Sequence, residues 1–117
     1  MIKLKEIRLS KSKDKLNISF NDGFASELTA ELLRVESPSA EVQGHGFGQK
    51  KTPFGKKYIK IVSIVSIGNY AIRIKFNDGH ETGIYSWDFL HNLSLNKSKI
   101  WESYLKRLKE KKLSRTV

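Results

Sequence analysis

The sequence contains no cysteine, which excludes disulfide bonds, thiolate metal sites and cysteine nucleophiles. No apolar run approaches the roughly 18 residues that a membrane-spanning helix requires. The opening residues, Met-Ile-Lys-Leu-Lys-Glu, lack the apolar core of a signal peptide. We therefore expect a protein without a membrane anchor that is located in the cytoplasm.

Acidic residues are also scarce relative to basic ones, and the excess charge is unevenly distributed. The net charge is +10 over 117 residues, and most of the lysines and arginines lie in residues 3–15, 50–60 and 97–115. This length suffices for one domain with a modest core, and we expect residues 1–117 to form it. The basic clusters fit solvated faces; alternatively, they form a surface for nucleic acid or an acidic partner.

Residues typical of catalysis are few. The three histidines are His45, His80 and His91, and no Ser-His-Asp order or paired carboxylates stand out. We therefore expect no enzymatic activity. His80 with Glu41 or His45 is a candidate metal site, but the glycines on either side of His45 argue against a helix that presents Glu41 and His45 together.

The stretch 69–90 predicts a β-hairpin that leads into a helix. Every second residue of its first strand is apolar: Tyr70, Ile72, Ile74 and Phe76. Gly79 ends an Asn-Asp-Gly turn and is expected at positive φ. Ser86 is a candidate N-cap for the helix that follows. The return strand is expected to place on one face His80, Thr82 and Ile84.

A similar pattern occurs earlier in the chain. Ile-Ser-Phe-Asn-Asp-Gly at 18–23 matches Ile-Lys-Phe-Asn-Asp-Gly at 74–79 with an offset of 56 residues, which aligns Leu28 with Ile84. Two interpretations remain open. The two hairpins share only their turn chemistry, or they belong to an internal pseudo-repeat.

These patterns predict an α+β fold in which antiparallel β-hairpins form a small sheet system with two or three helices. Residues 2–9 are expected to form an edge strand and residues 58–67 a central strand. The glycine- and lysine-rich stretch 44–57 invites a phosphate-binding interpretation but does not fit the P-loop pattern, so we expect a mobile loop. Residues 97–112 predict a basic amphipathic helix with an apolar stripe of Ile100, Trp101, Tyr104, Leu105 and Leu108.

Two long motifs, at 33–46 and 68–87, resemble the small domain found at the N-terminus of γ-butyrobetaine hydroxylase and trimethyllysine hydroxylase, also called the DUF971 family. The resemblance extends from about Ile7 to Leu93 and is closest to the stand-alone bacterial members. Elsewhere in the family the domain precedes an iron- and 2-oxoglutarate-dependent catalytic domain or is fused to iron–sulfur carrier proteins. Because 117 residues leave no room for that catalytic domain, hydroxylase activity is not implied.

The resemblance also bears on zinc. Zinc-binding members carry a Cys-Pro-Cys-x-x-Cys motif that a later histidine completes. By this resemblance, Ser37, Ser39 and Val42 occupy the cysteine positions here, and His80 aligns with the histidine. Serine and valine are not comparable zinc ligands, so we expect no structural zinc and no other cofactor. The same alignment implies that residues 37–42 lie next to His80.

We therefore expect a non-catalytic binding or accessory module with a protein partner, linked to iron-enzyme or iron–sulfur pathways by resemblance alone. The alternatives are a basic nucleic-acid-binding protein and a small metal-binding protein that uses His80. The candidate partner-binding residues are Arg34, Ser37, Ser39, Glu41, Gln43, His45, His80, Tyr85 and Trp87. Alternatively, Tyr85 and Trp87 are core residues, and Arg34 and Glu41 form a local ion pair.

Overall fold

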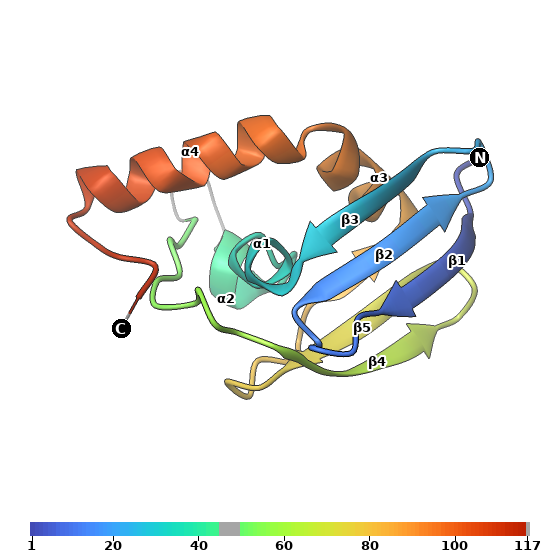
Figure 1. Ribbon diagram of the computed structural model, residues 1–117, viewed down its shortest axis with the longest axis horizontal. Coiled ribbons are helices and arrows are strands. Elements are labelled where there is room, and N and C mark those ends of the chain that lie inside the picture. Colours follow the sequence, from blue (N-terminus) through green and yellow to red (C-terminus); the bar gives the residue numbers. More distant parts are fainter. Residues whose placement is uncertain (45–49, 117) are drawn as a thin grey trace.

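The computed structural model describes residues 1–44 and 50–116, which form two three-stranded antiparallel sheets and four helices (Figure 1). The first sheet contains β1 (Leu4–Leu9), β2 (Lys15–Phe20) and β3 (Ala25–Thr29) in that order. The second contains β4 (Ile61–Ile67), β5 (Ala71–Phe76) and β6 (Ile84–Ser86). The helices are α1 (Ala30–Val35), α2 (Ala40–Gln43), α3 (Trp87–Leu95) and α4 (Lys97–Glu110). The predicted α+β class is confirmed. Two or three helices were predicted, and the additional one is α2, which has a single turn.

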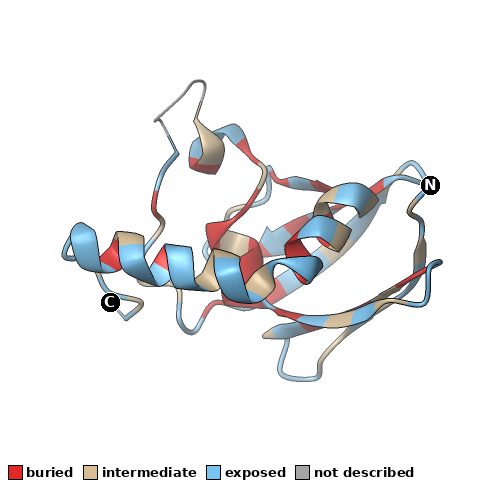
Figure 2. Ribbon diagram, turned by 90° about the horizontal axis from the view of Figure 1, so that it is seen from above, coloured by how far each residue is buried: buried red, intermediate tan, exposed pale blue. Residues whose placement is uncertain are grey.

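Both sheets contribute their inner faces to one apolar core. Alternate residues of β2 and β5, including Ile18, Phe20, Ile74 and Phe76, are buried together, as the two-residue period of a strand requires. The predicted C-terminal helix, α4, adds a smaller cluster around Tyr104 and presents its opposite side to solvent (Figure 2). No helix within the described ranges is long and apolar enough to cross a membrane.

Each sheet is built from the same unit, a three-stranded meander followed by a helix. The outer strands β1 and β4 both shift register just after their first residues, Leu4 and Ile61. Thr29 and Ser86 each cap the following helix by accepting a hydrogen bond from the backbone amide three residues later. These equivalent positions lie 57 residues apart, and their agreement favours the pseudo-repeat over shared turn chemistry alone.

The two turns agree in the same detail. Gly23 and Gly79 have φ values of +87° and +91°, so the prediction of positive φ for Gly79 is confirmed and Gly23 adopts the same conformation. In each turn the aspartate accepts a hydrogen bond from the backbone amide two residues later, at 3.0 Å. The turn chemistry therefore determines the same local geometry twice.

The alignment of Leu28 with Ile84 is wrong by one residue. Leu28 pairs with Leu16 in the first sheet, and Tyr85 pairs with Ile72 at the equivalent place in the second. Leu28 and Tyr85 are both fully buried, whereas Ile84 is 48% exposed. The second unit therefore has one more residue than the first between its turn and its last strand.

Two strand predictions need correction. The strand β6 begins only at Ile84, so the predicted strand face with His80 and Thr82 does not form. The apolar segment that was expected to be central is the edge strand β4, where Val62 and Val65 are about half exposed. A short apolar run does not distinguish an edge strand from a central one, because both present alternate residues to the core.

The helix of each unit contacts the turn of the other unit. Arg34 in α1 donates to Asp78 at 2.8 Å, and His91 in α3 lies 2.8 Å from Asp22. Arg34 and His91 are themselves 57 residues apart, so this exchange of contacts is part of the repeat. It places the end of α1 beside the second turn.

The described part of the glycine-rich loop is tied to its surroundings. Backbone hydrogen bonds join Lys51 to Val42 in α2, and join Gly55 and Lys57 to the C-terminal residues 114–115. Residues 50–60 therefore pass beside α2 and the second turn without forming a helix or strand.

Candidate functional site

His80 directly follows the second turn and is partly buried against the connection between α1 and α2. Its Nε2 lies 3.0 Å from Ser37 Oγ and 3.2 Å from Ser39 Oγ. The Ser37 hydroxyl also donates to Ser39 Oγ at 3.1 Å. These three side chains, called the serine–histidine cluster below, are adjacent, as the alignment of the motifs implied.

Local structure fixes both serines. Ser37 follows the end of α1 and is fully buried. Ser39 occupies the N-cap position of α2, but its side chain makes no cap hydrogen bond there and lies against His80 instead. Gln43 donates from Nε2 to the Ser37 carbonyl at 2.9 Å and closes the connection from the other side.

Gly83 allows the return segment to approach this connection closely. Residues 81–83 lie between the second turn and β6. This connection is one residue longer than the one between the first turn and β3. A Cβ atom on Gly83 would overlap Ser37 Oγ and lie 3.1 Å from the Tyr85 ring. Glycine is therefore required here by lack of space rather than by backbone conformation.

The equivalent contact, between the first turn and α3, is different. Phe24 stands where the second unit has His80, and it stacks near Phe20 and packs against the edge of His91. Ser94, the counterpart of Ser37, is buried, and its hydroxyl has no hydrogen-bond partner among the described residues. The same scaffold thus forms without the serine–histidine cluster.

Asp78 is held by two cations. Its Oδ2 accepts hydrogen bonds from Arg34 Nε at 2.8 Å and Lys56 Nζ at 2.6 Å. Burial raises the pKa of Asp78, but hydrogen bonds from Lys56, the His80 amide and Arg34 outweigh burial and lower the pKa to about 2. The alternative in which Arg34 pairs with Glu41 is wrong, because Asp78 takes that place.

Glu41 instead lies on the outer side of the serine–histidine cluster. It accepts a hydrogen bond from the Thr82 hydroxyl at 2.8 Å, which is the main cause of the lowered pKa of Glu41. This contact joins α2 to the return segment. Neither Thr82 nor Gly83 was predicted from the sequence as a site residue. The signal that points to them is that the connection between the turn and the last strand is one residue longer in the second unit.

Tyr85 and Trp87 do not offer the aromatic surface predicted for the site. Tyr85 is fully buried, and its hydroxyl donates to the Leu33 carbonyl at 2.6 Å. Trp87 donates from Nε1 to the Asn69 carbonyl at 2.7 Å, at the end of β5 opposite His80. Six strand residues place these ends roughly 17 Å apart, so Trp87 is not part of the cluster. The remaining candidate, His45, lies outside the described residues.

Burial is the main cause of a lowered His80 pKa, and the positive charge of Arg34 adds to it against the opposing effects of Glu41 and Asp78. The neutral imidazole is therefore favoured in the folded protein. As the pH falls, His80 is protonated in the unfolded chain at a higher pH than in the folded protein. The free energy of unfolding is therefore expected to fall as the pH drops below about 6.5, towards the folded-state pKa.

Denaturant unfolding between about pH 8 and pH 5, above the range in which Asp78 titrates, measures this effect. The variant His80→Gln is expected to show a flatter pH dependence than the wild type. An equal slope in both proteins would contradict the assignment.

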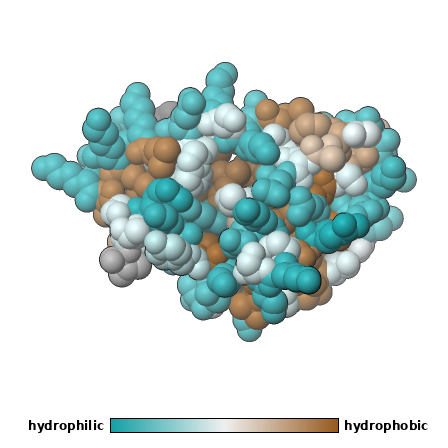
Figure 3. All heavy atoms as spheres, in the orientation of Figure 1, coloured by the Kyte–Doolittle hydropathy of each residue, from teal (hydrophilic) through white to brown (hydrophobic). Residues whose placement is uncertain are grey.

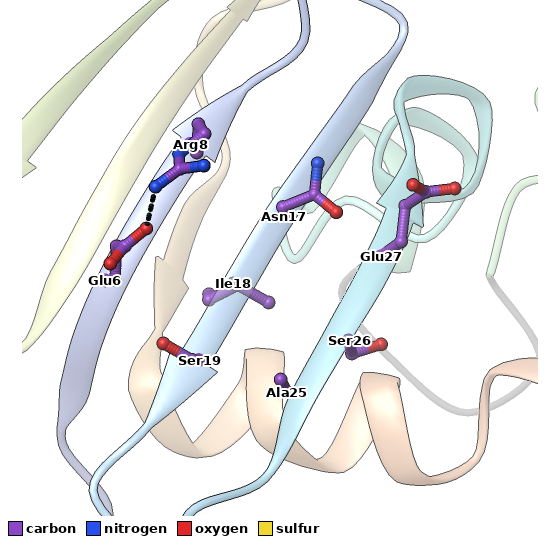
Figure 4. A pocket seen from close by; sticks show the side chains of 8 residues that line it. All are labelled: Glu6, Arg8, Asn17, Ile18, Ser19, Ala25, Ser26 and Glu27. Atoms are coloured by element: carbon purple, nitrogen blue, oxygen red, sulfur yellow. Dashed lines mark hydrogen bonds and ion pairs between the residues drawn. The ribbon is translucent and has the colours of Figure 1, made fainter.

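A hollow of about 600 Å³ lies on the outer face of the first sheet (Figure 4). Small side chains, including Ser19 and Ala25, form its floor between Arg8 on β1 and Glu27 on β3. Arg8 is already paired with Glu6 at 2.6 Å. Size alone therefore does not identify the functional site, and the polar contacts are concentrated where the second turn meets the end of α1.

The fold and this cluster define a class of small α+β domains made of two meander–helix units. The chain belongs to the γ-butyrobetaine hydroxylase-like, N-terminal family, whose model matches residues 7–91. No curated protein matches the sequence.

Solved structures agree with this family assignment. One NMR solution structure is 44% identical, with a TM-score of 0.83, 98% of this chain covered and 86% of the other. A second is 37% identical, with a TM-score of 0.85 and coverage of 98% and 90%. The crystal structure of a DUF971-family protein of unknown function from Acidithiobacillus ferrooxidans is 35% identical, with a TM-score of 0.65 and coverage of 79% and 92%.

The side chains at the family's zinc positions do not fit zinc. Ser37 and Ser39 present hydroxyl groups, and Val42 is a buried aliphatic residue, so His80 is the only strong ligand among the four. Within residues 1–44 and 50–116, no three His, Cys, Asp or Glu side chains are grouped as metal ligands would be.

We expect the purified protein to contain no stoichiometric zinc. The triple variant Ser37→Cys, Ser39→Cys, Val42→Cys is expected to gain about one zinc per chain, because it supplies three thiolates beside His80. Elemental analysis measures both. About one zinc per wild-type chain, lost in His80→Ala, would contradict this expectation.

Proposed function

We propose that the protein is a non-catalytic module that binds a protein partner at the serine–histidine cluster and the surface around it. One observation carries the proposal: where the second turn meets the end of α1 there are a partly buried histidine, bonded serines and an extra residue, and none of these occurs where the first turn meets α3. The contact between the first turn and α3 forms with Phe24 and an unbonded Ser94 instead, so folding alone does not require these features.

Burial argues against a catalytic role for these serines. A serine nucleophile needs access to its substrate and a base oriented by a third group. Ser37 is fully buried, Ser39 is 5% exposed, and both hydroxyls contact the same imidazole nitrogen. The hydrogen bonds among Ser37, Ser39 and His80 therefore fit a structural role under the surface better than activation of a nucleophile.

Partner capture from the cytoplasmic fraction of the native host tests the proposal. His80→Ala is expected to reduce the captured partner at least tenfold with a nearly unchanged melting temperature, and His45→Ala is expected to weaken capture as well. His91→Ala is the matched control, because His91 contacts the other turn. Equal capture by the wild type and His80→Ala would contradict the proposed site. The captured protein would also decide whether an iron-enzyme or iron–sulfur pathway is involved.

A second candidate function is nucleic-acid binding, which the outward side of α4 favours. Lys99, Lys106 and Lys109 are exposed there, while Tyr104 and Leu108 face inward (Figure 2). Phosphate contacts make affinity fall steeply with salt. A salt series with single- and double-stranded probes, repeated with Lys106→Glu, distinguishes this candidate from partner binding at His80.

A further inference from the structure

Beside the serine–histidine cluster, α1, α2 and residues 51–56 line an open cavity of about 510 Å³. Three cationic side chains line it, and Glu41 is the single carboxylate among its described lining residues. The cations are Arg34, Lys51 and Lys56. Figure 3 shows one face of the molecule, on which hydrophilic and hydrophobic patches are mixed.

Two of the residues that line the cavity carry a polar atom without a hydrogen-bond partner among the described residues. Arg34 Nη1 and Thr52 Oγ1 are buried, and neither has a hydrogen-bond partner in residues 1–44 and 50–116. Thr52 as a whole is only 9% exposed. Buried polar atoms left without partners cost about 1–3 kcal/mol each, so a ligand that supplies acceptors would be favoured here.

The charges limit the kind of acceptor. Asp78 already neutralises part of the charge of Arg34 and Lys56, whereas Lys51 makes no ion pair within the described part of the chain. The remaining positive charge is modest, since Glu41 also lines the cavity. It therefore suits a singly charged carboxylate better than a doubly charged phosphate.

Apolar groups complete the wall. Val42 is buried, and Phe54 is 55% exposed although it is a large apolar side chain. An exposed phenylalanine beside a lysine that makes no ion pair among the described residues is typical of a site that takes an acidic group together with an apolar neighbour.

We propose that this cavity binds a carboxylate of the protein partner, carried next to an aromatic or aliphatic side chain. The inference rests on the proposed function and names the chemistry that the partner presents there. Phe54 contacts the apolar side chain, and Lys51 pairs with the carboxylate. Arg34 and Thr52 supply donors that the fold leaves unused.

The test uses the whole chain labelled with ¹⁵N and titrated with acetyl-Asp-Phe-amide. Backbone amide shifts are expected to concentrate at residues 51–56. The neutral isostere acetyl-Asn-Phe-amide and the variant Lys51→Glu are each expected to bind at least tenfold more weakly. Lys5→Glu is the matched control, because Lys5 is exposed on β1 and does not line the cavity.

Equal binding of the two peptides, or no effect of Lys51→Glu, would overturn the proposal. Tighter binding of inorganic phosphate than of the acidic peptide would overturn the choice of a carboxylate. If Lys51→Glu abolishes peptide binding while His80→Ala leaves partner capture intact, the cavity stands and the proposed role of the serine–histidine cluster fails.

Discussion

Replacing Gly83 by alanine is expected to lower the free energy of unfolding by roughly 2 kcal/mol, because the added Cβ overpacks a closed site. The Cβ would overlap Ser37 Oγ and crowd the Tyr85 ring. Neither neighbour yields easily. Ser37 is fully buried and bonded to Ser39, and the Tyr85 hydroxyl is held by the Leu33 carbonyl.

A double-mutant cycle with Ser37→Ala identifies the cause. Removing the Ser37 hydroxyl removes the atom that the new Cβ meets, so Gly83→Ala is expected to cost at least about 1 kcal/mol less in that background. Denaturant unfolding of the four proteins gives the coupling. Costs that simply add, or a Gly83→Ala protein as stable as the wild type, would refute the close contact.

The Gly79→Val variant is expected to lose more than about 1 kcal/mol of stability, for a different reason. No atom lies within 4 Å of a Cβ built on Gly79, so space is not limiting. Its φ of +91° is the obstacle, because a β-branched residue rarely adopts such a conformation. Gly79→Asn is expected to cost less, since asparagine tolerates positive φ better.

The repeat supplies the control for this prediction. Gly23 has a φ of +87° and equally open space, so Gly23→Val is expected to cost about as much as Gly79→Val. Thermal unfolding of both variants measures this. An unchanged melting temperature for either would contradict the hairpin assignment at that turn.

Local signals in the sequence predicted most of the secondary structure. The Asn-Asp-Gly turns, the cap at Ser86 and the apolar stripe of α4 each depend on neighbouring residues alone. Asn96 occupies the N-cap position of α4, but its side chain bonds to Asn92 instead of capping the helix.

Features that depend on tertiary pairing could not be predicted in the same way. The edge position of β4 follows from which strand pairs with β5, and the apolar sequence of β4 is compatible with either place. The extra residue before Tyr85 becomes visible only when the registers of the two sheets are compared. The pairing of Arg34 with Asp78 joins residues 44 positions apart and has no local signal.

The candidate site was predicted in part. The family resemblance correctly placed Ser37 and Ser39 beside His80. It wrongly included Trp87 in the site. The sequence motif does not show that Trp87 lies at the end of β5 opposite His80. The cavity around Lys51 was also missed, since its wall combines two helices with an irregular segment.

The most direct measurement of where the partner binds is photo-crosslinking in the native host. p-Benzoylphenylalanine at position 54 reports on the cavity, and the same residue in place of Asn17 reports on the hollow of the first sheet. A discrete crosslinked protein from position 54, absent from position 17 and lost when His80→Ala is added, is the expected result. Crosslinking from position 17 alone, or crosslinking from position 54 that His80→Ala leaves unchanged, would contradict a partner site around the second turn and the end of α1.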